Sequence, residues 1–211
     1  MENWEKIKEI YLKITPLIES RLNEFKKISK QGSDKDIFKE LIFCLLTPQS
    51  KAKVCWTAVE NMDSKGILLK GDKKQILKEL KGVRFKSLKT DYIIKARKMF
   101  FKNSFKKMIK KFNNASQLRE WLARHVKGMG YKEASHFLRN IGMGENFAIL
   151  DRHILKNLKL LGVIENIPNT LSWKKYMEIE KRMQEFSKKI NLPMSHLDLL
   201  LWYKETGEVF K

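Results

Sequence analysis

The chain has 211 residues, of which 43% are hydrophobic and 10% aromatic. This composition supports a buried core in one or two compact lobes, and it excludes an intrinsically disordered chain. Lysine and arginine number 44 against 24 aspartate and glutamate, so the formal net charge is +20. A surface this basic favours polyanions as partners, with nucleic acid first and an anionic membrane second, unless the charge serves only solubility.

The chain contains two cysteines, Cys44 and Cys55. Their spacing, within what we interpret as two successive helices, fits neither a disulfide framework nor a zinc or iron–sulfur ligand set. The first residues are charged throughout, and the longest apolar runs are too short to span a bilayer. We therefore expect a cytoplasmic protein that needs no metal or cofactor and does not bind a membrane.

Helical periodicity dominates the sequence, and no stretch shows the alternation of a β-strand. We expect an all-α fold of about ten to twelve helices joined by short loops. Residues that break helices mark the predicted loops. These fall near Gly32, Pro48, Gly66 to Gly71, Gly82, Asn113 and Asn114, Gly128 to Gly130, Gly142 to Gly144, Pro168 and Pro193.

Three amphipathic patterns in the second half of the chain surround the candidate site. Apolar residues recur at helical spacing in 118–126, 134–141 and 154–161. The last pattern ends at Gly162, a residue type that commonly terminates helices. These three helices, with the loops between them, contain the residues of chemical interest.

The segment Val126 to Gly130 joins the first two of these helices and contains two glycines, Gly128 and Gly130. Small residues let the backbone approach another surface, and the following helix begins with N–H groups that have no partner inside the helix. Such a helix N-terminus binds phosphate groups. An ordinary helical hairpin held by packing alone is the alternative interpretation.

Lys132 lies in the first turn of the helix after this hairpin, at the positive end of the helix dipole. This position disfavours the ammonium form, and partial burial would disfavour it further. Because the neutral amine is the nucleophilic form of lysine, Lys132 is a candidate catalytic residue. A surface lysine tolerated at a cost of about 0.3–1 kcal/mol is the alternative.

Asp151 comes directly before the apolar pattern of 154–161, where we predict that it is the N-cap. A capping carboxylate is held ionised in a fixed place. If the loop 142–150 turns the following helix back, Asp151 could face Lys132, accept its proton and stabilise a developing positive charge. The alternative is a cap without a catalytic role.

The run VKGMGYKEASHFLRNIG, followed by AILDRHIL, resembles the helix-hairpin-helix DNA glycosylase superfamily, and most closely its archaeal-type 8-oxoguanine DNA glycosylase/AP lyase branch. The resemblance extends over nearly the whole chain. It implies a two-lobed all-α fold in which the N-terminal helices and about 150–211 form one lobe and about 40–145 the other, with the hairpin at 126–130. It also implies that Lys132 attacks C1′ of the damaged nucleotide and forms a Schiff base, with Asp151 as the activating carboxylate.

The resemblance also implies DNA contacts from two turns in the first half of the chain. Gln49, in LLTPQS, would fill the gap left by the flipped nucleotide. Arg84 and Phe85, in VRFKS, would contact the unpaired cytosine or wedge beside it. The alternatives are a helix that simply ends before a turn at Pro48 and a Phe85 that is buried.

Further roles follow from the resemblance for the hairpin and the end of the chain. Gly128, Gly130 and His153 would contact the DNA backbone, although an ordinary surface histidine is an alternative for His153. Trp202 would line the base pocket, and Lys211, the last residue, would help recognise the oxidised base. A terminal carboxylate could accept the N7–H that distinguishes 8-oxoguanine from guanine. A core tryptophan and a loose tail are the alternatives.

The resemblance therefore predicts a DNA repair enzyme that removes 8-oxoguanine from double-stranded DNA and nicks the abasic site by β-elimination, without an obligate protein partner. A glycosylase/lyase for oxidised pyrimidines is one alternative, and a non-catalytic helix-hairpin-helix DNA-binding protein is another. The superfamily often has a proline shortly before the aspartate, whereas this chain has NFAILD. The four-cysteine cluster of endonuclease III relatives is also absent, which favours the 8-oxoguanine branch.

Overall fold

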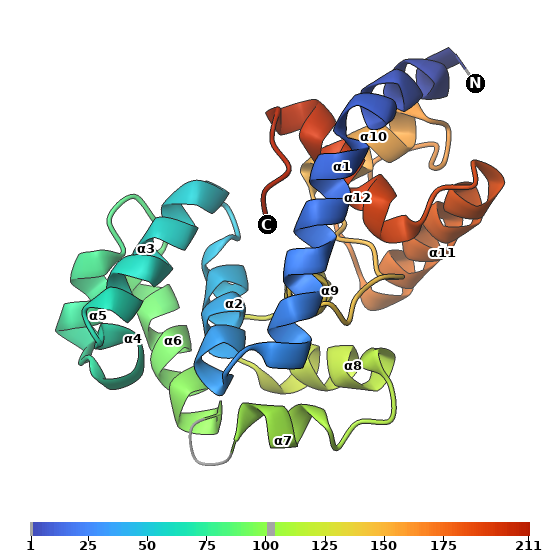
Figure 1. The fold of residues 1–211 in the computed structure, drawn as a ribbon. Coiled ribbons are helices and arrows are strands. Elements are labelled where there is room, and N and C mark those ends of the chain that lie inside the picture. Colours follow the sequence, from blue (N-terminus) through green and yellow to red (C-terminus); the bar gives the residue numbers. More distant parts are fainter. Residues whose placement is uncertain (1, 101–103) are drawn as a thin grey trace. The chain divides into compact units, whose positions relative to one another are not determined.

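The computed structural model describes the backbone of residues 2–100 and 104–211 and the side chains of residues 4–100 and 104–211. Within these ranges every regular element is a helix, which confirms the all-α prediction (Figure 1). Contacts divide the chain into two compact units. The first unit combines Met1–Ser29 with Leu138–Lys211, and the second is Lys30–Phe137.

The second unit is built around one buried helix, α2. In chain order the unit contains α2 (Asp34–Leu46), α3 (Ala52–Ser64), α4 (Ile67–Lys70), α5 (Lys73–Glu79), α6 (Lys86–Phe100), α7 (Phe105–Ile109), α8 (Ala115–His125) and most of α9 (Tyr131–Asn140). From Ile37 onward α2 is buried on nearly every side and packs against α3, α6 and α7. A capping box between Ser33 and Asp36 fixes its first turn. The turn that follows Leu46 therefore begins in the core of the second unit.

Aromatic contacts join distant segments of the second unit. The rings of Phe100 and Phe105 stack with centroids 4.0 Å apart, and Phe105 stacks in turn on Phe137 at 5.8 Å. Phe43 meets Trp56 edge to face at 5.6 Å. Because Phe137 belongs to α9, these contacts fix that helix against α6 and α7.

The first unit is a cluster of long helices. It contains α1 (Glu2–Gln31), the end of α9, α10 (Arg152–Leu160), α11 (Trp173–Lys189) and α12 (Met194–Thr206). α12 packs against both α10 and α11. α1 lies in the same unit (Figure 1). It is joined to the other helices through an edge-to-face contact between Trp4 and Phe186 and a 3.1 Å hydrogen bond between the Tyr11 hydroxyl and His196 Nδ1.

The loop after α9 passes very close to α1. Gly142 has a φ of 72°, and a Cβ placed on it would lie 2.7 Å from the Cα of Lys26. Only glycine fits such an approach without a shift of the backbone. An ion pair of 2.7 Å between Lys26 and Glu145 lies in the same region. The start of the loop that leads to Asp151 is thus held against α1.

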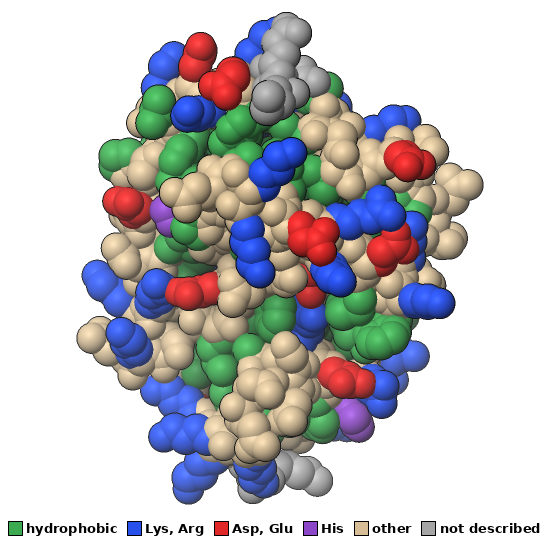
Figure 2. Space-filling view, turned by 90° about the vertical axis from the view of Figure 1, so that its right-hand side faces the viewer, with side chains coloured by type: hydrophobic (Ala, Val, Ile, Leu, Met, Phe, Trp, Pro, Cys, Tyr) green, Lys and Arg blue, Asp and Glu red, His purple; other side chains and the backbone are tan. Residues whose placement is uncertain are grey.

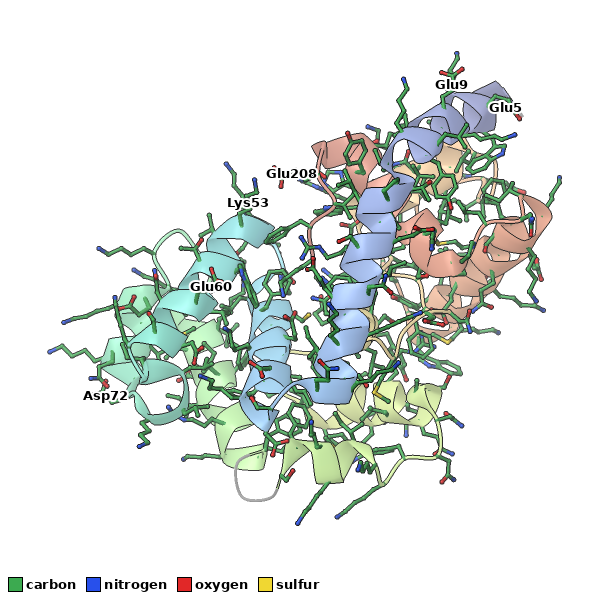
Figure 3. All side chains as sticks on the ribbon, viewed as in Figure 1. Glu5, Glu9, Lys53, Glu60, Asp72 and Glu208 are labelled. Atoms are coloured by element: carbon green, nitrogen blue, oxygen red, sulfur yellow. The ribbon has the colours of Figure 1, made fainter. Side chains whose placement is uncertain are left out.

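Lysine and arginine residues are distributed along the whole sequence and are not gathered in one basic segment. Figure 2 shows lysine and arginine spread over the face in view, with acidic side chains among them. On the second unit, exposed groups such as Lys53 and Glu60 on α3 and Asp72 before α5 extend into solvent (Figure 3). None of the helices in the described ranges combines the length and the apolar composition of a membrane span.

Both cysteines are buried thiols, and neither forms a disulfide. The Cys55 thiol donates to the Leu46 carbonyl at 3.2 Å, and burial raises its pKa to about 11. A thiol that resists ionisation is a poor nucleophile and a poor metal ligand. No group of three or more His, Cys, Asp or Glu side chains that could hold a metal ion occurs in residues 4–100 and 104–211.

Candidate active site

The hairpin between α8 and α9 is tight and packed against α6. α8 ends at His125 with Val126 as its C-cap, and the Met129 N–H donates to the Val126 carbonyl at 3.1 Å. Gly128 has a φ of 89°, and a Cβ placed on it would lie 2.2 Å from the ring of Tyr92 on α6. Both the backbone conformation and the aromatic ring therefore exclude other residues at Gly128. Val126 and Met129 are buried, so this turn presents its backbone to its surroundings.

Lys132 follows this hairpin in the first turn of α9, and its side chain is 26% exposed. Its ammonium lies 3.1 Å from a carboxylate oxygen of Glu133. The other oxygen of Glu133 accepts the backbone N–H of Gly130 at 3.0 Å. An acid in the first helical turn matches the helix dipole, and here the same acid also balances the lysine charge.

Glu133 is a residue that the sequence analysis did not single out. The expectation that an ammonium is unfavourable at this helix end rested on the helix dipole and on partial burial, whereas the structure places a carboxylate 3.1 Å from the ammonium. The signal was present, because Glu133 lies three residues after Gly130, at the position where a capping-box acid bonds back to the start of a helix. Lys132 is therefore held in place before any substrate binds.

Asp151 is the N-cap of α10, as predicted. Its Oδ1 accepts the backbone N–H groups of both His153 and Ile154, each at 2.8 Å. Within the described part of the chain Oδ2 makes no hydrogen bond in the cap, so one carboxylate oxygen is available for another partner. Lys132 belongs to the second unit and Asp151 to the first, and their pairing stays a prediction.

The loop before Asp151 is buried, and side chains from α11 hydrogen-bond to its backbone. The Tyr176 hydroxyl donates to the Ala148 carbonyl at 2.5 Å and accepts from the Leu150 N–H at 3.4 Å. Glu180 accepts the Ala148 N–H at 2.8 Å. Buried backbone groups need such partners, and a loop without secondary structure must take them from side chains.

A buried ion pair supports the same loop. Asp198 on α12 accepts from the Arg139 guanidinium at 2.5 Å and from the Ile149 N–H at 3.4 Å. The side chains of Arg139 and Asp198 are 6% and 3% exposed. Burial raises the pKa of the Asp198 carboxyl, and the guanidinium opposes that shift. Side chains from α9, α11 and α12 thus fix the loop that leads to Asp151, in which the sequence NFAILD contains no proline.

His153 and Trp202 lie together in the first unit. Their rings meet edge to face with centroids 5.4 Å apart, and His153 Nδ1 lies 3.8 Å from Glu205. His153 is therefore partly buried against α12, and its proposed contact with the DNA backbone stays a prediction. Trp202 is half-buried, as is Lys211 at the end of the chain. Their roles in recognising the base stay predictions.

Glu205, at the end of α12, connects this region to α10. Its carboxylate accepts from Lys156 at 2.8 Å, from Asn157 at 3.1 Å and from Lys204 at 3.1 Å. The hydrogen bond from Lys156 is the largest cause that lowers the pKa of the Glu205 carboxyl to about 2. The sequence analysis missed Glu205, because its partners on α10 are distant in the chain.

The two turns expected to contact DNA lie side by side in the second unit. The Ser50 hydroxyl accepts the backbone N–H of Arg84 at 3.0 Å. Gln49 and Phe85 both have a φ of 56°, a left-handed conformation that residues other than glycine seldom adopt. Phe85 is 54% exposed with the Arg84 guanidinium 5.6 Å from its ring centroid, so the alternative of a buried Phe85 is wrong.

Comparison with known proteins identifies relatives over the whole chain. A family model described as 8-oxoguanine DNA glycosylase (Ogg-HhH) matches residues 18–192. A protein of Fusobacterium nucleatum named 8-oxoguanine DNA glycosylase/AP lyase is 44% identical over 213 residues, covering 100% of this chain and 98% of the relative. A relative of the same name from Methanocaldococcus jannaschii is 42% identical over 199 residues, covering 94% of this chain and 93% of its own.

The solved structures that resemble this chain are also 8-oxoguanine DNA glycosylases. The crystal structure of the Methanocaldococcus jannaschii 8-oxoguanine glycosylase/lyase in complex with a 15mer DNA containing 8-oxoguanine superposes with a TM-score of 0.91. It is 40% identical and covers 100% of both chains. The 8-oxoguanine DNA glycosylase of Thermotoga maritima gives a TM-score of 0.88 at 34% identity, covering 98% of this chain and 97% of the other.

We predict that Tyr176→Phe lowers the free energy of unfolding by about 1–3 kcal/mol, because it leaves buried loop groups without a hydrogen-bond partner. Urea denaturation measures the change. Tyr203→Phe is the matched control, since Tyr203 is half-buried at the end of α12 and its hydroxyl makes no hydrogen bond in the described residues. Equal stability of the two variants would show that the Tyr176 hydroxyl does not support the loop.

We further predict that Glu205→Gln destabilises the protein by about 1 kcal/mol at pH 7, because it weakens charge-assisted hydrogen bonds. The pKa of Glu205 falls from 4.5 to about 2 in the folded protein, so its stabilising effect is complete above pH 4.5 and is lost as the pH falls toward 2. The stability difference from the unsubstituted chain should shrink over that interval. Glu60→Gln, at an exposed position, should show no such pH dependence.

Proposed function

Since the chain belongs to the 8-oxoguanine DNA glycosylase family, we propose that it removes 8-oxoguanine from double-stranded DNA and then nicks the abasic site. The observation that supports this most strongly is the similarity over the full chain to a glycosylase/lyase bound to DNA that contains 8-oxoguanine. The family and the enzyme class expected from the sequence are thereby confirmed. A cytoplasmic location stays a prediction.

Lys132 is the proposed nucleophile. Its neutral amine attacks C1′ of the damaged nucleotide, the C1′–N9 bond breaks, and the base leaves as an anion that takes up a proton. The attached amine then loses one proton, and the C1′–O4′ bond breaks with O4′ taking up a proton, which opens the sugar ring and leaves a protonated Schiff base. Loss of a proton from C2′ then expels the 3′ phosphate by β-elimination and nicks the strand. The hairpin and the first turn of α9 would hold the Lys132 amine where it can attack C1′.

The carboxylates near the reacting amine have separate proposed roles. Glu133 lies 3.1 Å from the Lys132 ammonium and can accept its proton before the attack. Asp151 is the activating carboxylate of the family, and its charge would stabilise the positive charge that develops at C1′. Because its Oδ1 caps α10, Asp151 can act through Oδ2 without releasing the helix end.

Access to C1′ requires that the damaged nucleotide leaves the helical stack. Gln49 would fill the space that the nucleotide vacates, and Phe85 with Arg84 would contact the base left unpaired. The exposure of Phe85 supports a wedge, since a buried ring could not enter DNA. The net charge of +20 would supply affinity for phosphates that does not depend on sequence.

The end of the chain is the proposed reader of the base. Trp202 would line the pocket, and the terminal carboxylate of Lys211 would accept the N7–H of 8-oxoguanine, which guanine lacks. The edge-to-face contact of Trp202 with His153 and the ion pairs of Glu205 support this proposal, because they join the end of α12 to the start of α10. Within the first unit these contacts would link the proposed base-recognition residues to Asp151, the cap of α10.

We predict that Lys132→Gln abolishes strand nicking while DNA binding stays within about tenfold, or 1.4 kcal/mol. Borohydride trapping on duplexes with 8-oxoguanine, thymine glycol or guanine measures the Schiff base. The unsubstituted chain should form an adduct selectively with 8-oxoguanine, and the variant none. Nicking that persists in the variant would exclude Lys132 as nucleophile. An adduct only with thymine glycol would support a pyrimidine glycosylase, and tight binding without any adduct a non-catalytic DNA-binding protein.

Deletion of Lys211 should reduce excision of 8-oxoguanine by about tenfold or more and affect nicking of a preformed abasic site much less, because an abasic site has no base to recognise. Single-turnover rates on the two duplexes measure the effect. Lys188→Met, at an exposed position of α11, serves as a control for the loss of one lysine in the first unit. Equal losses on the two substrates would remove the role of the terminus in base recognition.

A further inference from the structure

Lys89, on α6, is a buried lysine that the family resemblance does not explain. Its side chain is 3% exposed, and its ammonium donates to the carbonyls of Leu46 and Pro48, each at 2.7 Å. A third hydrogen bond of 3.1 Å goes to the hydroxyl of Ser50. An ammonium has three N–H donors, so all of them are used by one short stretch of chain.

The three acceptors belong to the end of α2 and the turn that follows. Carbonyls in the last turn of a helix have no partner within the helix, and here they are buried or half-buried. The turn includes Gln49, whose left-handed conformation is unfavourable for a residue other than glycine. An unfavourable conformation persists only where surrounding contacts impose it. The three hydrogen bonds from Lys89 go to residues on both sides of Gln49 in the chain.

The same network reaches the second exposed turn. The Ser50 hydroxyl that accepts from Lys89 also accepts the backbone N–H of Arg84 at 3.0 Å. Phe85, the next residue, has its own left-handed backbone and an exposed ring. One buried ammonium therefore connects two strained turns, each of which ends in an exposed side chain able to contact a base.

Lys89 is costly to keep charged. Burial lowers its pKa, and the positive charges of Lys132 and Arg84 lower it further. An apolar side chain of similar length would fill the space on α6 without that cost, but it could not donate to three acceptors. The buried ammonium of Lys89 thus lowers the stability of the core but fixes the geometry of the two turns.

We propose that Lys89 is a positioning residue that holds the Gln49 turn against the Arg84–Phe85 turn, and so determines how the enzyme contacts the base opposite the lesion. This inference rests on the proposed function, because it assumes that the exposed side chains of these turns enter DNA. Lys89 itself touches no substrate. Its effect should be larger where an opposite base is present, because Arg84 and Phe85 then have a base to contact.

The test is Lys89→Met, which keeps the length of the side chain and removes its donors. Lys95→Met, at an exposed position of α6, is the control for the lost charge. Two duplexes are compared, one with cytosine opposite 8-oxoguanine and one with tetrahydrofuran, which has no base. We expect Lys89→Met to lower kcat/KM by about tenfold or more with cytosine and by less than about threefold with tetrahydrofuran. Lys95→Met should match the unsubstituted enzyme on both.

Ser50→Ala provides a second variant that leaves α6 and the core unchanged. It removes the hydroxyl that connects Lys89 to the Arg84 backbone. We therefore expect kcat/KM to fall selectively on the duplex with cytosine, by a smaller factor than in Lys89→Met. This variant decides the question if Lys89→Met does not fold. Parallel losses on the two duplexes, or no loss in either variant, would show that Lys89 has only a structural role and would overturn the proposal.

The controls separate this outcome from a failure of the proposed function. If the unsubstituted enzyme and Lys95→Met do not excise 8-oxoguanine from either duplex, the proposed function is wrong, and the inference about Lys89 falls with it. If both are active and the variants at Lys89 and Ser50 retain the same ratio of rates on the two duplexes, only the inference about Lys89 is wrong.

Discussion

Buried backbone that is not part of a helix must find hydrogen-bond partners, and this requirement shapes both units of the protein. In the second unit the end of α2 obtains its partners from Lys89 on α6. In the first unit the loop before Asp151 obtains them from Tyr176, Glu180 and Asp198 on α11 and α12. Each of these loops leads to a residue proposed to contact or transform DNA, so the partners of the backbone also position the site.

The charges of the site are balanced locally, although the chain as a whole is strongly basic. Lys132 has Glu133 beside it, and Arg139 is buried with Asp198. Glu205 accepts from Lys156 and Lys204. Charges that determine geometry are thus paired, whereas the many exposed lysines remain available for phosphates. Lys89 departs from this pattern, since the hydrogen bonds of its ammonium go to uncharged oxygens.

The helix α9 belongs partly to each of the two units. Its first residues belong to the second unit, where Phe137 packs on Phe105, and its last residues belong to the first, where Arg139 pairs with Asp198. The proposed nucleophile lies at one end of the helix, and a side chain that supports the loop to Asp151 lies at the other. A change in the core contacts of α9 would therefore affect both parts of the proposed chemistry.

The sequence by itself determined the helices, the tight turn at Gly128 and the cap at Asp151, because these follow from spacing along one helix or from the backbone needs of one residue. The motif around Lys132 was sufficient to identify the family. The tertiary structure alone decided that Phe85 is exposed, that Lys89 hydrogen-bonds to the turn at Gln49, and that Tyr176 and Asp198 hydrogen-bond to the loop before Asp151. The physical reason is that partners of buried polar groups lie far away in the chain, and only packing brings them within hydrogen-bond distance.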